Sequence, residues 1–396
     1  MSNIKAYDVS EVNGEFKELI TLVSIRLMDP SGIYILTDTM ESTKPKILLI
    51  EPFYGGSHKQ LIDKINDTLV TVGMETHLAT LTAKKWHWRA RVSALILWEQ
   101  IPYLEFEYIF TSSVLSLAEL MGLRPDLGKA KKIVYFHENQ LVYPVREKKE
   151  RDFQYGYNQI TTCLVADAVV FNSEYNMQSF LHAIVPFLKL MPDYRIKNIP
   201  ENISKKSIVL YFPIEVPKLP PFEKNGPLHI VWNHRWEHDK NPNDFFSALF
   251  ELSDEKFEFR LSVLGESYAD NPPIFQEAKE KLSEHVFRWG YLETKAEYFD
   301  TLLRGDVVIS TAVHEFFGVS MLIASYARKL EVTLRRKYLF PSSSIVPLYK
   351  YCIRHTAEYG CLLYGDAPKT VLEPPQKIQN RQIEWAAPLH MSRSRL

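Results

Sequence analysis

The chain has 396 residues, of which 46% are hydrophobic and 24% charged, and its formal net charge at pH 7 is −1. This length and composition predict two α/β domains with sizeable cores, and they exclude a global basic field for nucleic acid or anionic lipid, so any such site must be a local patch. Three cysteines, no secretory signal and no apolar run long enough to span a bilayer favour a cytoplasmic protein, with the nucleus as a further location and no membrane partner.

Residues 1–44 form an N-terminal extension to which the pattern assigns no role. A first Rossmann-like domain is predicted over residues 45–213, because short apolar runs alternate with helical patterns there. The predicted strands are residues 46–50, 132–136 and 168–171, and polar side chains follow the last two. In parallel sheets ligands bind beyond the carboxyl ends of the strands, so these polar clusters are candidate sites.

The proline-rich residues 214–226 predict a linker. A second Rossmann-like domain is predicted over residues 227–324, facing the first across a cleft. We expect Asn241 to cap its first helix. The expected strands are residues 228–232, 257–264, 286–291 and 306–310, and the expected helices are residues 241–252, 273–282 and 294–304.

The pattern breaks after Ala324. Residues 325–396 are strongly basic, whereas the rest of the chain is acidic, and they show no clear periodicity. We expect an atypical C-terminal tail and a second domain that is incomplete at its C-terminus, which an alternative or misjoined coding sequence would explain.

The strongest candidate site is the stretch 232–241, WNHRWEHDKN, between a predicted strand and a predicted helix. Arg235 and Lys240, together with the helix N-terminus, suit a diphosphate. A charged surface loop explains the same pattern equally well. His234 and His238 have a spacing used by zinc sites, but they precede the helix and lack a third ligand nearby, which disfavours a metal.

Two further polar clusters follow predicted strands. In the sequence HEFFG, Glu315 could accept hydrogen bonds from sugar hydroxyls and Gly318 would allow close backbone approach, although a carboxylate at the start of a helix is an alternative. In the sequence HENQ, His137 precedes an acceptor and two amides, although a structural histidine is the commoner outcome for a single His.

Two other segments of the first domain are weaker candidates. The turn Gly55, Gly56, Ser57, His58 could hold a phosphate or an acceptor, and the absence of GxGxxG and Walker A sequences disfavours NAD and ATP enzymes. The segment 84–91 interleaves basic residues with indoles, as nucleic-acid sites do, although the pattern slightly favours a solvated helix face with buried tryptophans. Its candidate binding residues are Lys84, Lys85, Trp86, Trp88, Arg89 and Arg91.

Several long sequence segments resemble family 4 glycosyltransferases, and in particular the group that acts on queuosine in tRNA. The resemblance covers about residues 46–324, and the segments are rich in rare residue types, so chance similarity is improbable. They are EPFYGGSHKQ (51–60), AKKWHWRAR (83–91), YFHENQ (135–140), RDFQYGYNQ (151–159), HRWEHDK (234–240) and HEFFGV (314–319).

The resemblance implies the GT-B fold and a retaining transfer of mannose from GDP-mannose to queuosine in a tRNA anticodon, with tRNA-Asp as the expected tRNA and no metal or other cofactor. It places the segment 84–91 and the turn at residues 55–58 on the acceptor side. The roles that it implies are diphosphate binding for Arg235 and Lys240, the first glutamate of an E-x7-E motif for Glu315, backbone donors for Phe316, Phe317 and Gly318, and contact with the transferred sugar for His137.

One position departs from the family pattern. The E-x7-E motif requires a second glutamate, which usually binds the ribose, where this chain has Ile323. Two alternatives to a queuosine-tRNA mannosyltransferase therefore remain: a catalytically weak or inactive form that binds tRNA or nucleotide, and a family 4 enzyme with another acceptor.

Overall fold

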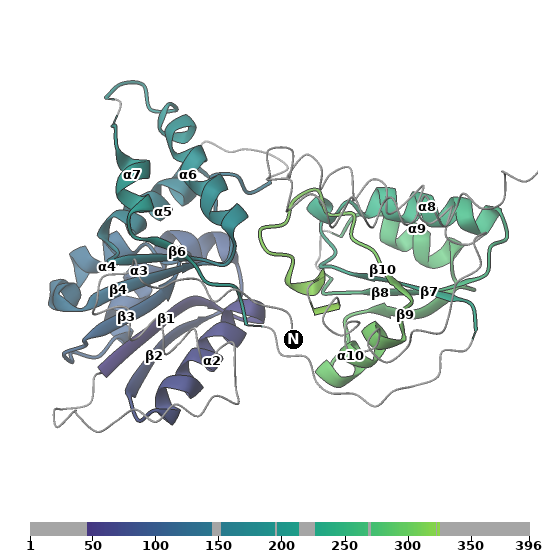
Figure 1. The fold of residues 1–396 in the computed structure, drawn as a ribbon, viewed down its shortest axis with the longest axis horizontal. Coiled ribbons are helices and arrows are strands. Elements are labelled where there is room, and N and C mark those ends of the chain that lie inside the picture. The colour runs from purple at the N-terminus through teal and green to yellow at the C-terminus, as the bar shows by residue number, and fades with distance from the viewer. Residues whose placement is uncertain are drawn as a thin grey trace, which may run out of the picture. The chain divides into compact units, whose positions relative to one another are not determined.

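The computed structural model describes residues 46–144, 152–194, 196–213, 226–267, 271–321 and 323–324. The chain divides into two compact units between Pro213 and Ile214 (Figure 1). The N-terminal extension, almost all of the linker and the C-terminal tail that the sequence predicts lie outside the described residues. No helix of the described ranges is both long enough and apolar enough to cross a bilayer.

The first unit is built on a six-stranded parallel sheet with the order β2-β1-β3-β4-β5-β6. The chain adds β2 on one side of β1 and all later strands on the other side, so the direction of winding reverses between β1 and β3. The strands are β1 (Lys46–Tyr54), β2 (Glu75–Thr82), β3 (Tyr108–Ser112), β4 (Lys131–Phe136), β5 (Ala168–Phe171) and β6 (Ser207–Val209).

Helices cover both faces of this sheet, with α2 on one face and α5 and α6 on the other (Figure 1). This explains the continuous apolar run of β1, in which Leu48 and Ile50 face the cluster formed with α3 to α6, while Ile47 and Leu49 are equally buried on the other face. The helices are α2 (Gly56–Thr71), α3 (Trp86–Gln100), α4 (Leu117–Leu123), the short η2 (Pro125–Lys129), α5 (Phe153–Val165), α6 (Glu174–Leu188) and α7 (Ile199–Ser204).

The second unit has a four-stranded parallel sheet with the order β10-β7-β8-β9, with α8 and α9 on one face and α10 on the other (Figure 1). Its winding reverses between β7 and β10. Its elements are β7 (Leu228–Asn233), η4 (His238–Lys240), α8 (Pro242–Asp254), β8 (Phe259–Leu264), α9 (Ile274–Lys281), β9 (Val286–Gly290), α10 (Lys295–Arg304) and β10 (Val307–Val308).

The predicted fold class, α/β with two Rossmann-like parallel sheets, is confirmed. Two details of the prediction are wrong. The last strand pairs only over Val307–Val308 instead of residues 306–310. Asn241 precedes α8 but does not cap it, because its backbone is left-handed (φ 47°) and its side chain donates to Asp244 instead of accepting from the helix.

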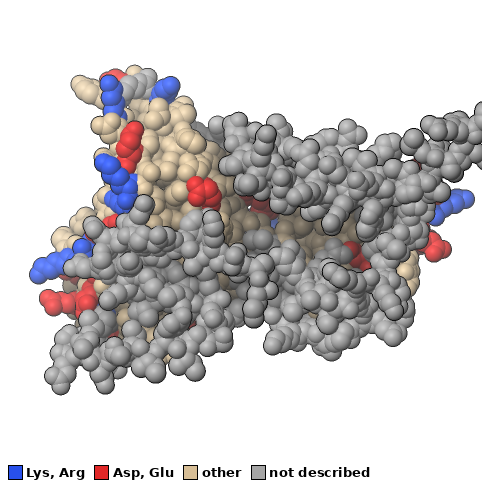
Figure 2. Space-filling view, viewed as in Figure 1, with Lys and Arg blue, Asp and Glu red and all other residues tan. Residues whose placement is uncertain are grey.

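Charged side chains of both signs are interspersed on the described surface that Figure 2 exposes. This distribution agrees with the net charge of −1. It also means that an anionic ligand must be recognised by a few placed cations and not by a general field.

Candidate active site

In the second unit, polar side chains gather where β7 and β10 end. These strands are neighbours at the point where the winding reverses, which is where open parallel sheets bind ligands. Hydrogen bonds join the two strand ends and the loops that follow them. Trp232 Nε1 donates to Thr311 Oγ1 (3.2 Å), Thr311 Oγ1 donates to the Lys240 carbonyl (2.8 Å) and Asn233 Nδ2 donates to the Ser320 carbonyl (3.0 Å). The loops are therefore held as one unit.

A glycine fixes the path of the first of these loops. Gly265, directly after β8, has φ +134°, and a Cβ added there would lie 1.8 Å from the carbonyl oxygen of His234. The two backbones can approach this closely only because residue 265 has no side chain.

Lys240 lies at the centre of the cluster. Its buried Nζ is 2.8 Å from Glu315 Oε1, 3.0 Å from Asp239 Oδ2 and 3.3 Å from the His314 carbonyl. The structure thus brings together Lys240 and Glu315, two of the residues singled out in the sequence, and adds Asp239 as a second carboxylate on the same cation.

Arg235 lies differently. Its side chain is half exposed and its guanidinium is 3.2 Å from Glu237 Oε1. Arg235 and Lys240 nevertheless act on the same neighbour: burial first, and then the charges of Lys240 and Arg235, together lower the pKa of His234 to about 3. Burial and the charge of Lys240 also lower the pKa of His314. Both imidazoles are therefore neutral at pH 7.

The residues that follow Glu315 are partly buried in apolar surroundings and partly open to a ligand. Phe316 is buried against the His314 ring, and Gly318 has φ +67° with open space where a Cβ would be. Ile323, the departure from the family motif, packs against an apolar cluster that contains Val231 and Leu302. An apolar environment at residue 323 offers no acceptor for a ribose hydroxyl.

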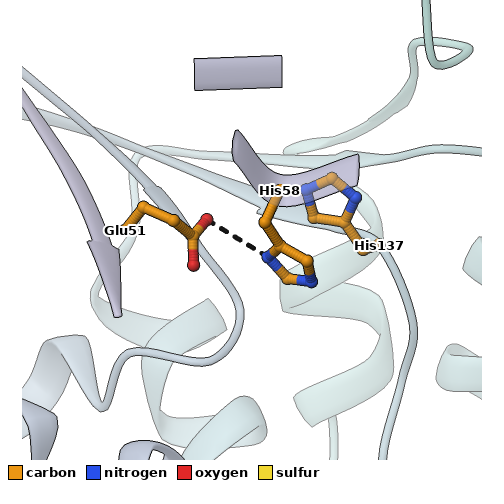
Figure 3. A group of neighbouring side chains, drawn as sticks. All are labelled: Glu51, His58 and His137. Atoms are coloured by element: carbon orange, nitrogen blue, oxygen red, sulfur yellow. Dashed lines mark ion pairs between the residues drawn. The ribbon is translucent and has the colours of Figure 1, made fainter. Parts of the chain in front are cut away.

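In the first unit, a second cluster lies at the corresponding reversal between β1 and β3. Glu51 from β1, His58 from the first turn of α2 and His137 directly after β4 are all buried, and Figure 3 shows the His137 ring alongside that of His58. Glu51 Oε2 is 3.2 Å from His58 Nδ1, and His58 Nε2 is 3.8 Å from Glu138 Oε2. The His58 and His137 rings stack with centroids 3.9 Å apart.

The two imidazoles differ in charge. Burial alone would lower the pKa of His58, but Glu51 and Glu138 together raise it to about 10. The pKa of His137 lies well below its ordinary value because the ring is buried and the charge of His58 is adjacent. At neutral pH an imidazolium therefore stacks on a neutral imidazole.

Glu51, His58 and His137 are the one group of possible metal ligands among the described residues, with ligand atoms within 4.8 Å of one another. The stacking argues against a shared ion. An imidazole nitrogen binds a metal along a lone pair in the plane of its ring, and two rings stacked 3.9 Å apart with an interplanar angle of 29° do not direct those lone pairs at one nearby point. The arrangement suits an ion pair better.

The glycine turn before His58 is shaped by close packing. A Cβ on Gly55 would lie 2.4 Å from Ala83 Cβ, and Gly56 has φ +52°, so both positions favour glycine. Ser57 is half-buried in the first turn of α2. The turn places His58 against Glu51.

Some side chains of the segment 84–91 are exposed and others have partners within the chain. Lys84, Lys85 and Trp88 are exposed. Trp86 packs in a cluster with Tyr155. Two arginines are engaged within the chain: Arg89 donates to Thr82 O and Oγ1 (both 3.1 Å), and Arg91 lies over the Tyr155 ring (4.5 Å) and 3.5 Å from Asp152.

Several residues of both clusters were not identified from the sequence. Glu51 and Ser112 are separated by 61 positions, yet Ser112 Oγ donates to Glu51 Oε1 (2.9 Å). Glu51 could have been identified from the sequence as a carboxylate within the largely apolar run KILLIEPFY. Asp239 and Thr311 carry no signal beyond their position in loops.

Comparisons with known proteins identify the family of this chain. Residues 46–214 match the family described as tRNA-queuosine alpha-mannosyltransferase N-terminal. Over 299 residues the chain is 51% identical to the tRNA-queuosine alpha-mannosyltransferase of Drosophila melanogaster, covering 72% of this chain and 78% of that protein.

Solved structures with similar folds include the lipopolysaccharide outer core galactosyltransferase WaaB in its apo form, with 14% identity, 70% of this chain and 77% of that chain covered, and a TM-score of 0.45. A glycosyltransferase from Rickettsia africae has 16% identity, coverage of 73% and 78%, and a TM-score of 0.45.

Proposed function

Since this chain belongs to the tRNA-queuosine alpha-mannosyltransferase family, we propose that it transfers mannose from GDP-mannose to queuosine in the anticodon of a tRNA. The observation that carries the proposal is the 51% identity, which spans 78% of a relative of that name. The activity is that of a glycosyltransferase, and we propose tRNA-Asp as the tRNA and the cytoplasm as the main location.

We place the donor at the β7/β10 end of the second unit. Negative charge grows on the diphosphate as the sugar leaves, and cations held in place stabilise it. Lys240 is held by two carboxylates, whereas Arg235, five residues earlier in the chain, has a half-exposed side chain. An arriving diphosphate can therefore recruit Arg235 directly and compete for Lys240. Glu315 would then be released to accept hydrogen bonds from sugar hydroxyls. Because side-chain cations occupy this position, we propose that the transfer needs no metal.

We place the tRNA on the first unit, at the start of α3. Lys84 and Lys85 are exposed there beside Trp88, whose side chain is 59% exposed. Exposed ammonium groups contact phosphates and an exposed indole offers a face on which an unpaired base can stack. Arg89 and Arg91 are tied to Thr82, Asp152 and Tyr155, so we assign them to holding α3 in place.

A second candidate function is donor or tRNA binding with little turnover. The observation that favours it is Ile323, which packs in an apolar cluster where the family motif requires a glutamate. A ribose hydroxyl buried there without an acceptor would cost about 1–3 kcal/mol.

One experiment separates the two candidates. The purified chain is incubated with GDP-mannose and tRNA-Asp carrying queuosine, with the same tRNA carrying guanosine as control, and GDP release, mannosylated nucleoside and donor binding are each measured. We expect transfer only to the queuosine tRNA, and equal rates with and without a chelator. Donor binding without GDP release supports the second candidate, and transfer to neither tRNA contradicts the first.

A further inference from the structure

We propose that His58 is a positioning residue: held between Glu51 and Glu138, it stacks on His137 and keeps that ring as a neutral imidazole with Nε2 presented to a substrate hydroxyl. This inference rests on the proposed function in one respect, the role of His137 beside the transferred sugar. The residues that hold His58 have no assigned role in the transfer.

The position of His58 is determined from two sides. Its Nδ1 is 3.2 Å from Glu51 Oε2, and its Nε2 is 3.8 Å from Glu138 Oε2. Glu51 is itself fixed, because its other oxygen accepts from Ser112 Oγ (2.9 Å) and from the Phe53 backbone N–H (2.8 Å). The carboxylate that holds the imidazolium is therefore preorganised by the backbone of β1 and the end of β3.

His137 is enclosed on several sides. The His58 ring stacks on it at 3.9 Å, the Tyr135 ring meets it edge-on at 4.9 Å and the Phe212 ring lies 6.0 Å away. Its backbone is fixed independently, because Asn172 Nδ2 donates to the His137 carbonyl (2.6 Å). The ring can therefore be replaced without releasing the chain that carries it.

The Nε2 atom of His137 is buried and has no hydrogen-bond partner among the described residues. A buried nitrogen of this kind is costly unless a ligand completes it. A neutral imidazole offers one donor and one acceptor, whereas an imidazolium offers two donors, so its charge decides what it can bind. At Nε2 the neutral ring can accept from a substrate hydroxyl or donate to it according to its tautomer, whereas the imidazolium can only donate.

The titratable groups around His137 come from four elements. They are His58 on α2, Glu51 on β1, Tyr135 on β4 and Glu138 in the loop after β4. Tyr135 donates its hydroxyl to the Leu210 carbonyl (3.1 Å), and burial raises its pKa, so it stays neutral. Of these groups, only the positive charge of His58 opposes protonation of His137. Burial is the largest cause of the low pKa of His137 and remains without His58, but the repulsion from the imidazolium would be lost and Glu51 and Glu138 would be left without their counter-ion.

The test combines nuclear magnetic resonance and kinetics on the full chain. Imidazole ¹⁵N and ¹³C resonances are recorded from pH 5 to 9 for the unaltered chain, His58→Gln, and the control His77→Gln. His77 is a suitable control because its Nε2 forms an exposed pair with Glu75 (3.1 Å) in the same unit. In the unaltered chain and the control we expect His58 charged and His137 neutral over this range. In His58→Gln we expect His137 to titrate within it.

The kinetic readout is the acid limb of the kcat/KM profile for mannose transfer. In His58→Gln we expect this limb to move up by at least one pH unit, with a loss of about tenfold per unit below it and a smaller change at pH 8. Should His58→Gln not fold, Glu51→Gln tests the ion pair instead. The pH at which the His58 imidazolium loses its proton should fall, because a carboxylate that raises its pKa is gone. The acid limb should stay in place or move down, since His58 remains charged there; an unchanged His58 titration would overturn the proposal.

Three other results would overturn the proposal: a neutral His58 at pH 7, an unshifted acid limb together with an unshifted His137 titration, or stoichiometric Zn²⁺ binding that perturbs both imidazoles. A His137→Ala chain that transfers mannose normally would remove the proposed role of His137. If the imidazole resonances of the unaltered chain and of His58→Gln still behave as expected, the electrostatic coupling between the two rings stands.

Discussion

The Nζ atom of Lys240 lies 2.8 Å from Oε1 of Glu315, so a cation and a carboxylate that both belong to the proposed donor site are paired with each other. Arg235, at the same strand end, keeps a half-exposed side chain. The two cations should therefore respond differently to substitution, which gives the donor assignment a sharp test.

We expect Lys240→Met to affect both stability and donor binding. It leaves Asp239 and Glu315 without their buried counter-ion, so the free energy of unfolding should fall by about 3 kcal/mol. Arg235→Ala should leave stability within about 0.5 kcal/mol but weaken GDP-mannose binding by about 1.5–3 kcal/mol. Thermal unfolding and donor titration measure the two effects.

The matched control for Arg235 is Arg304→Ala, whose guanidinium forms an exposed pair with Asp300 on α10 (2.7 Å). Arg304→Ala should change neither the free energy of unfolding nor the affinity for GDP-mannose. Equal donor affinity in the Arg235 and Arg304 variants would remove Arg235 from the donor site.

The tRNA assignment predicts a change in salt dependence. Replacing both Lys84 and Lys85 with Gln should lower the slope of log K against log salt by roughly 0.7–0.9 for each phosphate that the protein no longer neutralises. Lys189→Gln with Lys205→Gln, two exposed lysines elsewhere in the first unit, serves as the control and should leave the slope unchanged. If the two double variants have the same slope, tRNA does not bind at the start of α3.

Gly265 gives a prediction about stability. Gly265→Ala places a Cβ 1.8 Å from the His234 carbonyl oxygen at φ +134°, so the loop must move or the variant will not fold. We expect loss of donor binding with a midpoint of thermal unfolding lowered by several degrees or more. Gly122→Ala is the control, since it lies within α4 with open space around its Cβ, and it should be neutral or slightly stabilising. A Gly265→Ala chain as stable as Gly122→Ala would contradict the close approach.

The buried His234 predicts sensitivity to acid. Its pKa is lowered to about 3 in the folded chain, so below about pH 6.5 the unfolded chain binds a proton that the folded chain refuses. Stability should therefore be present above pH 6.5 and be lost as the pH falls towards 3, by about 2 kcal/mol between pH 7 and pH 5. His234→Gln should flatten this dependence, whereas the exposed His182→Gln should not. Denaturant titrations at the two pH values provide the measurement.

The pH dependence of stability that His58 predicts has the opposite sign to that of His234. The pKa of His58 is raised to about 10, so its contribution is complete below about pH 6.5 and is lost as the pH rises through 10. Unfolding of the first unit at pH 10.5 should accordingly be easier than at pH 7, and Glu51→Gln should reduce that difference. An unchanged difference in the Glu51 variant would indicate another titrating group.

The buried strands β5 and β7 were predictable because parallel strands covered on both faces leave apolar runs. The equally buried β3, with the sequence YIFTS, was not predicted, since Thr and Ser interrupt its apolar run. The strand β2 was not predicted, since it lies at the edge of its sheet and only Ala79 among its eight residues is buried. The three-residue β6 is likewise too short to leave a periodic signal. In the first unit, a strand is therefore recognised from the sequence only where buried residues form an uninterrupted apolar run.

The candidate sites were predictable as polar stretches after strands but not as sets of contacts. Lys240 and Glu315 stand 75 positions apart, and their pairing depends on β7 and β10 being neighbours, which the sequence does not specify. The engagement of Arg91 likewise depends on Tyr155 in α5 and on Asp152 just before it, whereas Arg89 bonds to Thr82 nearby in the chain. The tertiary partners of Arg91 are 61 or more positions away, so the sequence pattern of the segment does not reveal them.

The loop that carries Arg235 also contains an indole. Trp236 is buried, its ring stacks on Phe275 with centroids 4.3 Å apart, and it meets Trp289 edge-on at 5.6 Å. Indole emission depends on such neighbours, so the protein carries its own optical reporter one residue from a proposed diphosphate contact. The chain has seven tryptophans, so the emission that belongs to Trp236 is obtained as the difference from a Trp236→Phe variant, and its change on adding donor would report occupancy of the loop without a label.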